Sequence, residues 1–389
     1  MSTDLLTDPH CQPWLFPKAL YIHLPFCAHK CGYCDFAVVS GQDYKIDRYL
    51  LALEEEILQS GCSGHPTSIF VGGGTPTYLP EKQLEQFFTM LAQYFPLAPG
   101  GEFSIESTPE TLNPQKVAIL QHAGVNRISL GVQSFQDALL LQLDRGHQSQ
   151  QIDRAIELLK PAIPVISIDL IFGIPGQSLS QWQLDLQRAV DFGLQHLSTY
   201  GLTYEKGTPL WKQVNQGLLA PLGDDLELEM YQLAIDFLET NGYQHYEISN
   251  FALSGSQCRH NHVYWANHAY WGYGLGAARY VQGKRETNTR NFDAYFAKVF
   301  TGQSPTFQSE LLSPSETAQE TAAIQLRRTM GIQIDDFLKQ TNYDIRDLLQ
   351  SNLHNLVQQG YVLESTDSIS LNKKGRPLAD YLISKLVWG

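Results

Sequence analysis

Short apolar runs alternate with longer amphipathic stretches over residues 18–205, and this alternation decides the expected fold. The runs are rich in β-branched and aromatic side chains, and glycine, proline or polar residues bound them, as is typical of buried strands. They predict strands at Leu20–Leu24, Ser68–Val71, Glu102–Glu106, Arg127–Gly131, Pro164–Phe172 and His196–Tyr200.

The stretches between these runs repeat with the period of a helix. After the first run, apolar residues fall on one face and Glu54, Glu55 and Glu56 on the other; the apolar positions are Ile46, Tyr49, Leu50, Leu53 and Ile57. Similar helical windows cover Glu81–Tyr94, Asn113–Ala123, Gln150–Leu159 and Ser180–Phe192. Strands that alternate with helices predict an α/β fold in which helices pack outside a parallel sheet. Because the units are too few for a closed eight-fold barrel, we expect a partial (β/α)6 barrel, with a doubly wound sheet as the alternative.

The pattern changes after residue 205. A helix is predicted at Leu226–Thr240, with Leu228, Tyr231, Leu233 and Leu238 largely inward, and residues 213–220 resemble a loop. The last part combines helices at Thr317–Arg328, Asp335–Thr341, Leu348–Gln359 and Arg376–Val387 with strands at Gly360–Glu364 and Ser368–Leu371. We therefore expect an N-terminal arm (1–17), a barrel (18–205), a barrel-completing extension (206–309) and a small winged-helix-like domain (310–389).

Charge and composition narrow the function classes. The formal net charge of −13 argues against a surface for nucleic acid. No apolar run approaches the roughly 18 residues of a membrane span, and the polar, proline-broken N-terminus is unlike a signal peptide. Three of the six cysteines form one motif, whereas Cys11, Cys62 and Cys258 are scattered like ordinary thiols. This usage indicates a reducing compartment, so we expect a cytoplasmic protein.

The motif cysteines, Cys27, Cys31 and Cys34, follow the first strand at Cys-x3-Cys-x2-Cys spacing. Three thiolates on one loop can bind three irons of a cubane [4Fe-4S] cluster and leave the fourth iron open to a small molecule. The alternatives are a zinc site or incidental thiols. A zinc site usually needs two separated ligand pairs, and no second pair follows at that spacing.

Other unusual residues stand at the carboxyl ends of the predicted strands. Gly72–Thr77 follows the second strand, Glu106 ends the third, Gln133 follows the fourth and Asp169 lies in the fifth. In a barrel these ends form one rim, where binding residues gather. Each residue also has a plain structural explanation, such as a βα turn for the glycines or a helix cap for Glu106.

A second informative stretch lies at residues 258–280, where histidines are interleaved with tyrosines, tryptophans and glycines. Such a mixture favours a flat aromatic or tetrapyrrole-binding surface, with imidazole available to iron. The alternative is a core segment in which tyrosine and tryptophan pack with satisfied polar tips.

Several motifs occur in the order of a known family. They are Tyr21-Ile-His-Leu-Pro-Phe-Cys27, Gly72-Gly-Gly-Thr-Pro-Thr77, Arg127-Ile-Ser-Leu-Gly-Val-Gln133, Arg145-Gly-His147 and Asp169-Leu-Ile-Phe-Gly-Ile-Pro-Gly176. The chain resembles the radical S-adenosylmethionine (SAM) superfamily and, from residue 20 to about 385, its oxygen-independent coproporphyrinogen III oxidase-like proteins. The resemblance implies that SAM chelates the open iron and that one electron from the cluster releases a 5′-deoxyadenosyl radical.

When the family's functional residues are matched one by one to this chain, the resemblance implies that Cys27, Cys31 and Cys34 are the cluster ligands. The positions that match SAM contacts are Tyr21, Gly73, Gly74, Thr75, Glu106, Gln133, Arg145, Asp169 and Thr203. Asp144 stands where the family often has glycine, so we expect an ion pair with Arg145 that would weaken that contact.

Two features resemble the HemW-type heme chaperone branch of this family. Phe36 stands where the oxidases have a further cysteine, and the chain contains the motif His260-Asn261-His-Val-Tyr264-Trp265, whose His, Asn, Tyr and Trp become the heme candidates. The resemblance implies a chaperone that binds heme as cargo and transfers it to an acceptor hemoprotein, for example a respiratory one. The alternatives are coproporphyrinogen III oxidase or another radical SAM enzyme that modifies tetrapyrroles, so catalysis stays open.

Overall fold

The computed structural model describes residues 12–388. Within them, a 12-stranded sheet has the order β12-β11-β10-β9-β1-β2-β3-β4-β5-β6-β8-β7. Its centre is a run of parallel neighbours: β1 (Ala19–Leu24), β2 (Ser68–Gly73), β3 (Glu102–Ser107), β4 (Arg127–Gln133), β5 (Val165–Phe172) and β6 (His196–Gly201). The predicted strands are confirmed, each within two residues of the observed bounds.

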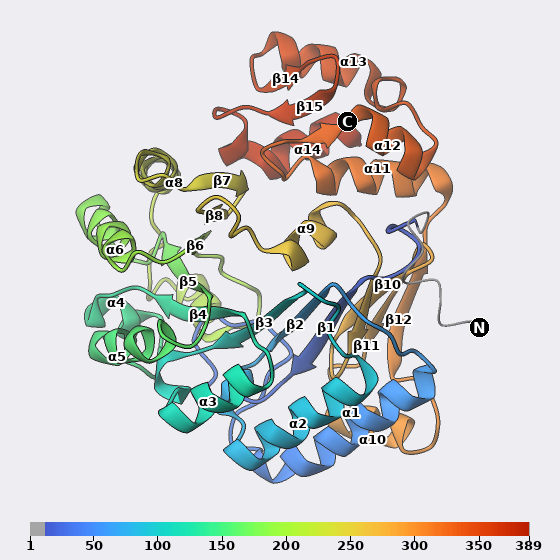
Figure 1. Cartoon of the computed structure of the whole chain (residues 1–389). Coiled ribbons are helices and arrows are strands. Elements are labelled where there is room, and N and C mark those ends of the chain that lie inside the picture. The colour runs from blue at the N-terminus through green and yellow to red at the C-terminus, as the bar shows by residue number, and fades with distance from the viewer. Residues whose placement is uncertain (1–11, 389) are drawn as a thin grey trace.

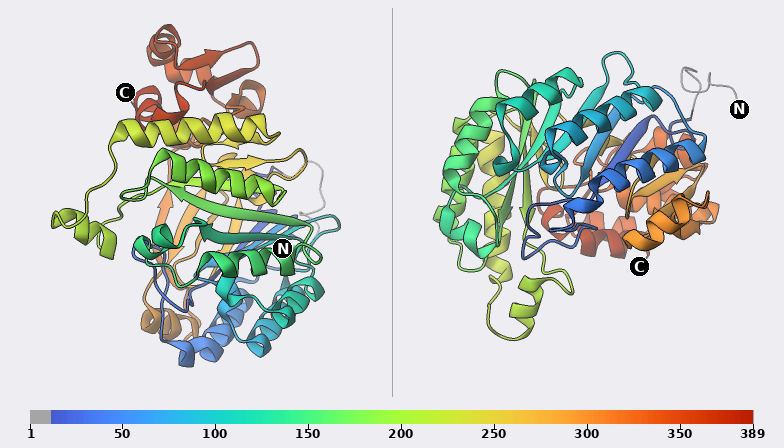
Figure 2. Two further views of the ribbon diagram at one scale, coloured as in Figure 1. Left: turned by 90° about the vertical axis from the view of Figure 1, so that its left-hand side faces the viewer. Right: turned by 90° about the horizontal axis from the view of Figure 1, so that it is seen from below.

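Helices follow these strands and cover one face of the sheet (Figures 1 and 2). They are α1 (Ile46–Ser60), α2 (Glu81–Tyr94), α3 (Pro114–His122), α4 (Asp137–Gln142), α5 (Ser149–Leu159) and α6 (Leu179–Asp191). Because strands β1–β6 are neighbours in chain order, every crossover returns on the same side of the sheet. This order fits the partial barrel and excludes the doubly wound alternative.

The two faces of strands β1–β6 differ in chemistry. Leu20 and Ile22 are fully buried against the outer helices, and Tyr21 and His23 alternate with them toward the concave inner face. Inner positions on the following strands are mostly polar: Ser68, Glu102, Glu106, Arg127, Ser129, Asp169 and Ser198. The apolar core therefore lies outside the barrel, and the inner face is suited to binding.

Further strands extend the sheet at both ends and leave it open. On one side lie β9 (Tyr270–Tyr273), parallel to β1, then β10 (Ala278–Val281), β11 (Lys284–Asn288) and β12 (Thr306–Leu311), which are antiparallel. On the other side lie β8 (Asn250–Ala252) and β7 (Gln244–Glu247). Within residues 12–388, β12 and β7 are the two edges of the sheet, and they do not pair with each other.

The segment that carries these strands also contains α7 (Pro209–Asn215), α8 (Asp224–Thr240), α9 (Arg259–Trp265) and α10 (Phe292–Val299). Helix α7 overlaps the residues expected to form a loop, because Thr208 caps it by accepting a hydrogen bond from the Trp211 backbone N–H at 3.2 Å. Leu228 was expected to face inward but is 48% exposed, since α8 instead buries Met230, Ala234 and Ile235.

The expectation that Glu56 lies on the solvent face of α1 is also wrong. Glu56 is buried and accepts hydrogen bonds from the Tyr295 hydroxyl at 2.6 Å, the Asn288 amide at 2.7 Å and the Gly274 N–H at 2.9 Å. These partners come from segments far along the chain, which local periodicity does not register. Burial raises the pKa of Glu56 to about 6.

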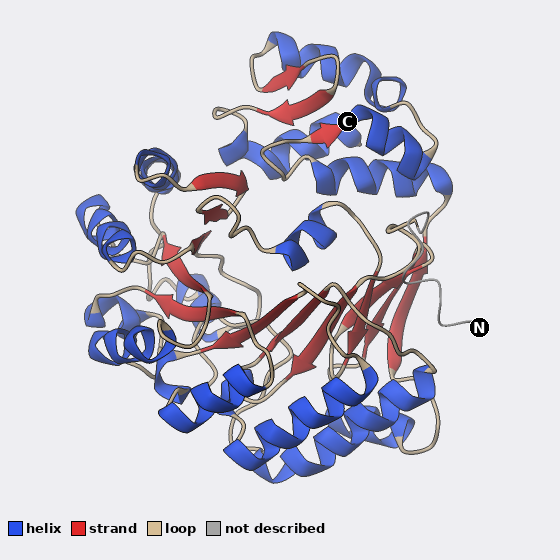
Figure 3. Ribbon diagram, in the orientation of Figure 1, coloured by secondary structure: helices blue, strands red, loops and turns tan. Residues whose placement is uncertain are grey.

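The C-terminal part has its own apolar core and lies on the side of the sheet opposite α1 and α2 (Figures 1 and 3). It consists of α11 (Pro314–Gln325), α12 (Ile334–Thr341), α13 (Ile345–Gln358) and α14 (Ala379–Val387), with a small sheet of β13 (Ile332–Gln333), β14 (Val362–Glu364) and β15 (Ser368–Leu371). The helices and strands predicted there are confirmed within three residues. The expected N-terminal arm lies outside the described residues up to residue 11, and no helix within residues 12–388 could cross a membrane.

Candidate functional site

The cysteine loop leaves the carboxyl end of β1 and closes on itself. The Cys27 N–H donates to the Val39 carbonyl at 2.9 Å, and the Val39 N–H donates to the Pro25 carbonyl at 2.8 Å. Gly32 ties the middle of the loop to the rim, because its N–H donates to the Leu143 carbonyl at 3.3 Å and its carbonyl accepts from the Leu210 N–H at 2.9 Å. The loop is therefore held in place by β1, the end of α4 and α7.

All three motif cysteines are free thiols. Arg145 Nη1 donates to Cys31 Sγ at 3.2 Å, and Thr75 Oγ1 donates to Cys27 Sγ at 3.7 Å. Burial raises the pKa of Cys27 to about 12 and also raises that of Cys34, so these thiols need a strong positive partner to ionise. Iron provides such a partner, and a cation beside Cys31 stabilises a thiolate there.

The donor set fits a cubane cluster better than a single metal ion. Within residues 12–388, no three histidine, cysteine or acidic side chains converge as the ligands of one ion do. The thiolates of a cubane bind different irons and need not converge on one point.

The glycine loop after β2 lies between the cysteine loop and β3. The Gly73 N–H donates to Glu106 Oε2 at 2.9 Å. A Cβ atom on Gly72 would come within 2.8 Å of the same oxygen, and one on Gly74 within 2.6 Å of the Phe26 carbonyl oxygen. Because only glycine permits this approach, the loop presents bare backbone beside the cysteines.

Two carboxyl groups face the concave side next to this loop. Burial raises the pKa of Glu106 to about 7, and the nearby charge of Asp169 adds to the effect. Asp169 accepts hydrogen bonds from Ser129 Oγ at 3.0 Å, and burial raises its pKa as well. Among the ion pairs of residues 12–388, neither carboxylate has a lysine or arginine partner. The charges of Arg127 and Arg145 partly offset the effect of burial on Asp169, so Glu106 is the carboxyl group better suited to a positively charged ligand.

The remaining SAM candidates lie within β1 (Tyr21), at the end of β4 (Gln133), after α4 (Arg145) and after β6 (Thr203). Arg145 Nη2 donates to the Gly131 carbonyl at 2.8 Å, and Gln133 has a φ of 69°. The Tyr21 hydroxyl lies 3.0 Å from His23 Nδ1. Thr203 is exposed beyond β6, and no hydrogen bond joins it to the other candidates among the described residues.

The expected pair between Asp144 and Arg145 does not form. Asp144 has a φ of 56° and its carboxylate instead lies 3.0 Å from His29 Nε2. The left-handed backbone at Asp144 turns its side chain toward solvent, while Arg145 points back to the cysteine loop. Arg145 is thus not neutralised by its neighbour in the chain.

Tyr200 was not singled out from the sequence, although it lies at the end of β6 on the same face as His196 and Ser198. Burial raises the pKa of its hydroxyl, and the nearby charge of Asp169 raises it further.

The heme candidates lie on α9, which contacts both β2 and α11 and so sits between the barrel and the C-terminal helices (Figure 1). Glu102 caps this helix, because its carboxylate accepts hydrogen bonds from the backbone N–H groups of Arg259 at 2.9 Å and His260 at 3.0 Å. The sheet therefore fixes the start of α9.

His260 is 0% exposed and both of its ring nitrogens are engaged. Nδ1 lies 3.1 Å from Ser68 Oγ, and Nε2 lies 2.9 Å from the Tyr264 hydroxyl. In this conformation the ring offers no free nitrogen to iron, which agrees with the satisfied-core explanation of its sequence pattern. Asn261, Tyr264 and Trp265 are partly exposed, and their heme contacts stay a prediction.

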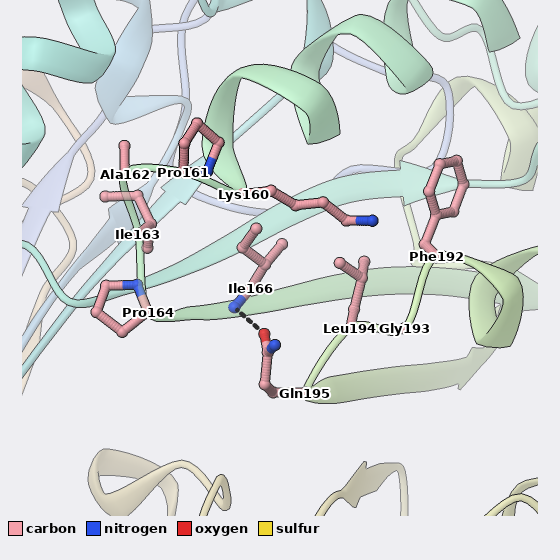
Figure 4. Close-up of a pocket in the computed structure, with 10 residues that line it drawn as sticks. All are labelled: Lys160, Pro161, Ala162, Ile163, Pro164, Ile166, Phe192, Gly193, Leu194 and Gln195. Atoms are coloured by element: carbon pink, nitrogen blue, oxygen red, sulfur yellow. Dashed lines mark hydrogen bonds between the residues drawn. The ribbon is translucent and has the colours of Figure 1, made fainter.

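A pocket of about 410 Å³ lies away from these residues (Figure 4). It is lined by Lys160–Pro164, Ile166 and Phe192–Gln195, at the amino ends of β5 and β6, and the Ile166 N–H donates to Gln195 Oε1 at 3.0 Å beside it. The cysteine loop is at the opposite, carboxyl end of the strands. This pocket therefore takes no part in the candidate site.

Comparisons with known proteins show which family the chain resembles. The radical SAM superfamily profile matches residues 21–189, and the HemN C-terminal domain profile matches residues 312–378. The heme chaperone HemW of Bacillus subtilis is 34% identical over 368 residues, which cover 93% of this chain and 97% of that protein. HemW of Synechocystis is 38% identical over 329 residues, covering 82% and 80%.

A solved structure of similar fold is that of coproporphyrinogen III oxidase (HemN) from Escherichia coli, with a TM-score of 0.83. Its sequence identity is 22%, and the match covers 95% of this chain and 89% of that one. At this identity the likeness establishes a common fold and leaves the activity open.

Proposed function

The chain belongs to the HemW family of radical SAM proteins, and from that premise we propose that it is a cytoplasmic heme chaperone that transfers heme to an acceptor hemoprotein. The observation that carries the proposal is identity above 30% to proteins named heme chaperone HemW over nearly the whole chain. The His260–Trp265 motif on α9, which contacts the first residues of β2 and β3, supports it.

The proposal includes a resident [4Fe-4S] cluster held by Cys27, Cys31 and Cys34, with SAM at the open iron. When bound, the cluster supplies single electrons for SAM chemistry. Glu106 would pair with the SAM ammonium group, because it is a buried carboxylate without a cationic partner. The bare backbone of Gly73 and Gly74 would let the ligand approach closely, and Arg145 would stabilise the Cys31 thiolate.

Coproporphyrinogen III oxidation is the second candidate, because the residues proposed for the cluster and SAM share one rim. The residue at the position where the oxidases have a further cysteine argues against this candidate. Phe36 stands there with its side chain 66% exposed, and a phenyl ring provides no thiolate. We therefore favour the chaperone.

Heme transfer tests the proposal directly. Protein reconstituted anaerobically with iron and sulfide is loaded with heme, separated from free heme, and mixed with a heme-free b-type cytochrome. We expect the Soret band to move from this protein to the cytochrome faster than from a serum albumin–heme control. Failure to bind heme at micromolar concentration, or transfer no faster than the control, would contradict the chaperone.

A further inference from the structure

The loop that follows α9 is held firmly against the C-terminal helices. The side-chain amides of Gln325 and Gln340 both donate to the Ala266 carbonyl at 3.1 Å, and Asn267 Nδ2 donates to Thr321 Oγ1 at 2.9 Å. Asn267 itself has a φ of 53°, a conformation that asparagine tolerates better than most residues. The next residue, His268, is thereby placed where α9, α11 and α12 meet.

His268 differs from the other histidines of this stretch. Its half-buried ring makes no hydrogen bond within residues 12–388, whereas His260 uses both ring nitrogens and His262 Nε2 lies 2.7 Å from Gln257 Oε1. A neutral imidazole with an uncommitted nitrogen is the state that binds iron. His260, inside the family motif, thus has both ring nitrogens engaged, whereas His268, just outside the motif, has a nitrogen available to iron.

A cation lies beside this imidazole. Arg328 is half-buried, and its guanidinium donates only to backbone carbonyls, those of Gly331 at 3.0 Å and Gln325 at 3.5 Å. Gln325 joins Arg328 to this loop, because its backbone carbonyl accepts from Arg328 and its side-chain amide donates to the Ala266 carbonyl. Burial lowers the pKa of His262 and of His268, and the charge of Arg328 lowers both further. Asp336 is the acid that influences Arg328, but it forms its ion pair with Lys339 at 3.3 Å. Arg328 therefore has no carboxylate partner among the described residues.

Aromatic side chains complete the surroundings. The Trp14 ring centroid lies 6.4 Å from that of His268, and the Arg327 guanidinium lies 5.9 Å from the Trp265 ring centroid. Both tryptophans are partly exposed. Heme combines a flat apolar macrocycle, an iron that accepts imidazole and two carboxylates, which correspond to the three kinds of group gathered here.

We propose that heme binds at the α9–α11 seam, defined as Trp14, His262, Trp265, His268 and Arg328, with the His268 imidazole on the iron and the Arg328 guanidinium on a propionate. The assignment rests on the proposed heme-chaperone function. It places the axial ligand of the heme iron outside the His-Asn-x-x-Tyr-Trp motif. The imidazole nitrogen donates its lone pair to iron, and no electron transfer or proton release is needed. His260 then acts as a positioning residue that fixes α9 on β2.

Full-length protein titrated with ferric heme tests the assignment, with Soret absorbance and electron paramagnetic resonance as readouts. His268→Ala is expected to weaken binding roughly 10- to 100-fold and to remove the imidazole-ligand spectrum. His268→Met should keep binding but change the axial-ligand signature, which a merely structural role would not do. His122→Ala, at an exposed histidine at the end of α3 and outside the seam, is the control and should keep the wild-type spectrum.

A second arm tests Arg328 with heme and with heme dimethyl ester, whose propionates carry no charge. Arg328→Gln should weaken heme binding roughly tenfold or more and leave ester binding unchanged. Equal loss for both ligands would overturn the propionate contact. Wild-type spectra in both His268 variants, or loss of the imidazole signal in His260→Ala alone, would overturn the ligand assignment while the chaperone proposal stands. If wild-type protein binds no heme, both proposals fail.

Discussion

At the scale of single residues, the candidate SAM site depends on charged groups whose usual partners are missing. Glu106 is the clearest, because burial and Asp169 raise its pKa to about 7 and no lysine or arginine of residues 12–388 forms an ion pair with it. Its location at the end of a strand was predictable from the sequence, since strand ends share a rim. Its protonation state was not, because the opposing Asp169 lies on another strand, far along the chain.

SAM binding should therefore depend on pH through Glu106. A carboxyl whose pKa is raised in the folded protein holds its proton up to about pH 7, so the ionised form that pairs with an ammonium appears only as pH rises through that value. We expect SAM affinity, measured by calorimetry, to rise roughly five- to tenfold from about pH 6 to about pH 7.5. Glu106→Gln should bind weakly with no such rise; an unchanged slope in this variant would contradict the assigned pairing.

The cysteine loop gives a second prediction at this scale. Replacing Cys27, Cys31 and Cys34 together with alanine should reduce the iron and sulfide content of reconstituted protein to background, because no other thiol lies in the loop. Phe36→Ala is the matched control and should keep full iron content, since the Phe36 side chain is exposed. Iron retained by the triple variant would place the cluster elsewhere.

At the scale of elements, α9 shows what local pattern cannot reveal. Its residues are only the span Arg259–Trp265, and a helix this short is not stable by itself. It exists because Glu102 of β3 caps it and Ser68 of β2 binds the His260 ring. Likewise, β7–β12 are short or polar, as in Lys284–Asn288, so their strand character comes from pairing with the sheet rather than from an apolar alternation.

Glu102→Gln should loosen α9. The carboxylate is buried and caps two backbone N–H groups, so losing its charge should reduce the free energy of unfolding by about 1–3 kcal/mol. Hydrogen exchange of residues 258–266 should speed up more than that of α1. Glu55→Gln, on the exposed side of α1, is the control. If exchange in α9 is unchanged, the helix is held by other contacts.

At the scale of the whole molecule, an open barrel and a separately cored C-terminal part meet at α9. The sequence predicted the parallel strands and the C-terminal helices well, because their hydrophobic periods are long and regular. It did not predict the α9–α11 seam, whose contacts join residues such as Asn267 and Thr321 across many elements. The sequence therefore identified the candidate heme residues as a group. Which of their side chains is free to bind heme depends on tertiary contacts that the sequence does not show.

The link between sheet and C-terminal part can be tested at Glu320. This α11 residue forms a partly buried ion pair with Arg285 of β11 and raises the pKa of that arginine. Glu320→Ala leaves the guanidinium without its partner and should lower the unfolding free energy in urea by about 1–3 kcal/mol. Asp336→Ala, which removes an exposed pair with Lys339, should change it by less than about 0.5 kcal/mol. Equal effects would mean that the Arg285 pair does not hold the two parts together.

The central claim is that this radical SAM protein carries heme rather than oxidising a porphyrinogen. One anaerobically reconstituted preparation, divided in two, tests it most directly. One half is titrated with heme and followed by the Soret band; the other is incubated with coproporphyrinogen III, SAM and a reductant and assayed for protoporphyrinogen. We expect saturable heme binding and no product. Protoporphyrinogen formed with SAM cleavage would contradict it and identify the protein as an oxidase despite Phe36.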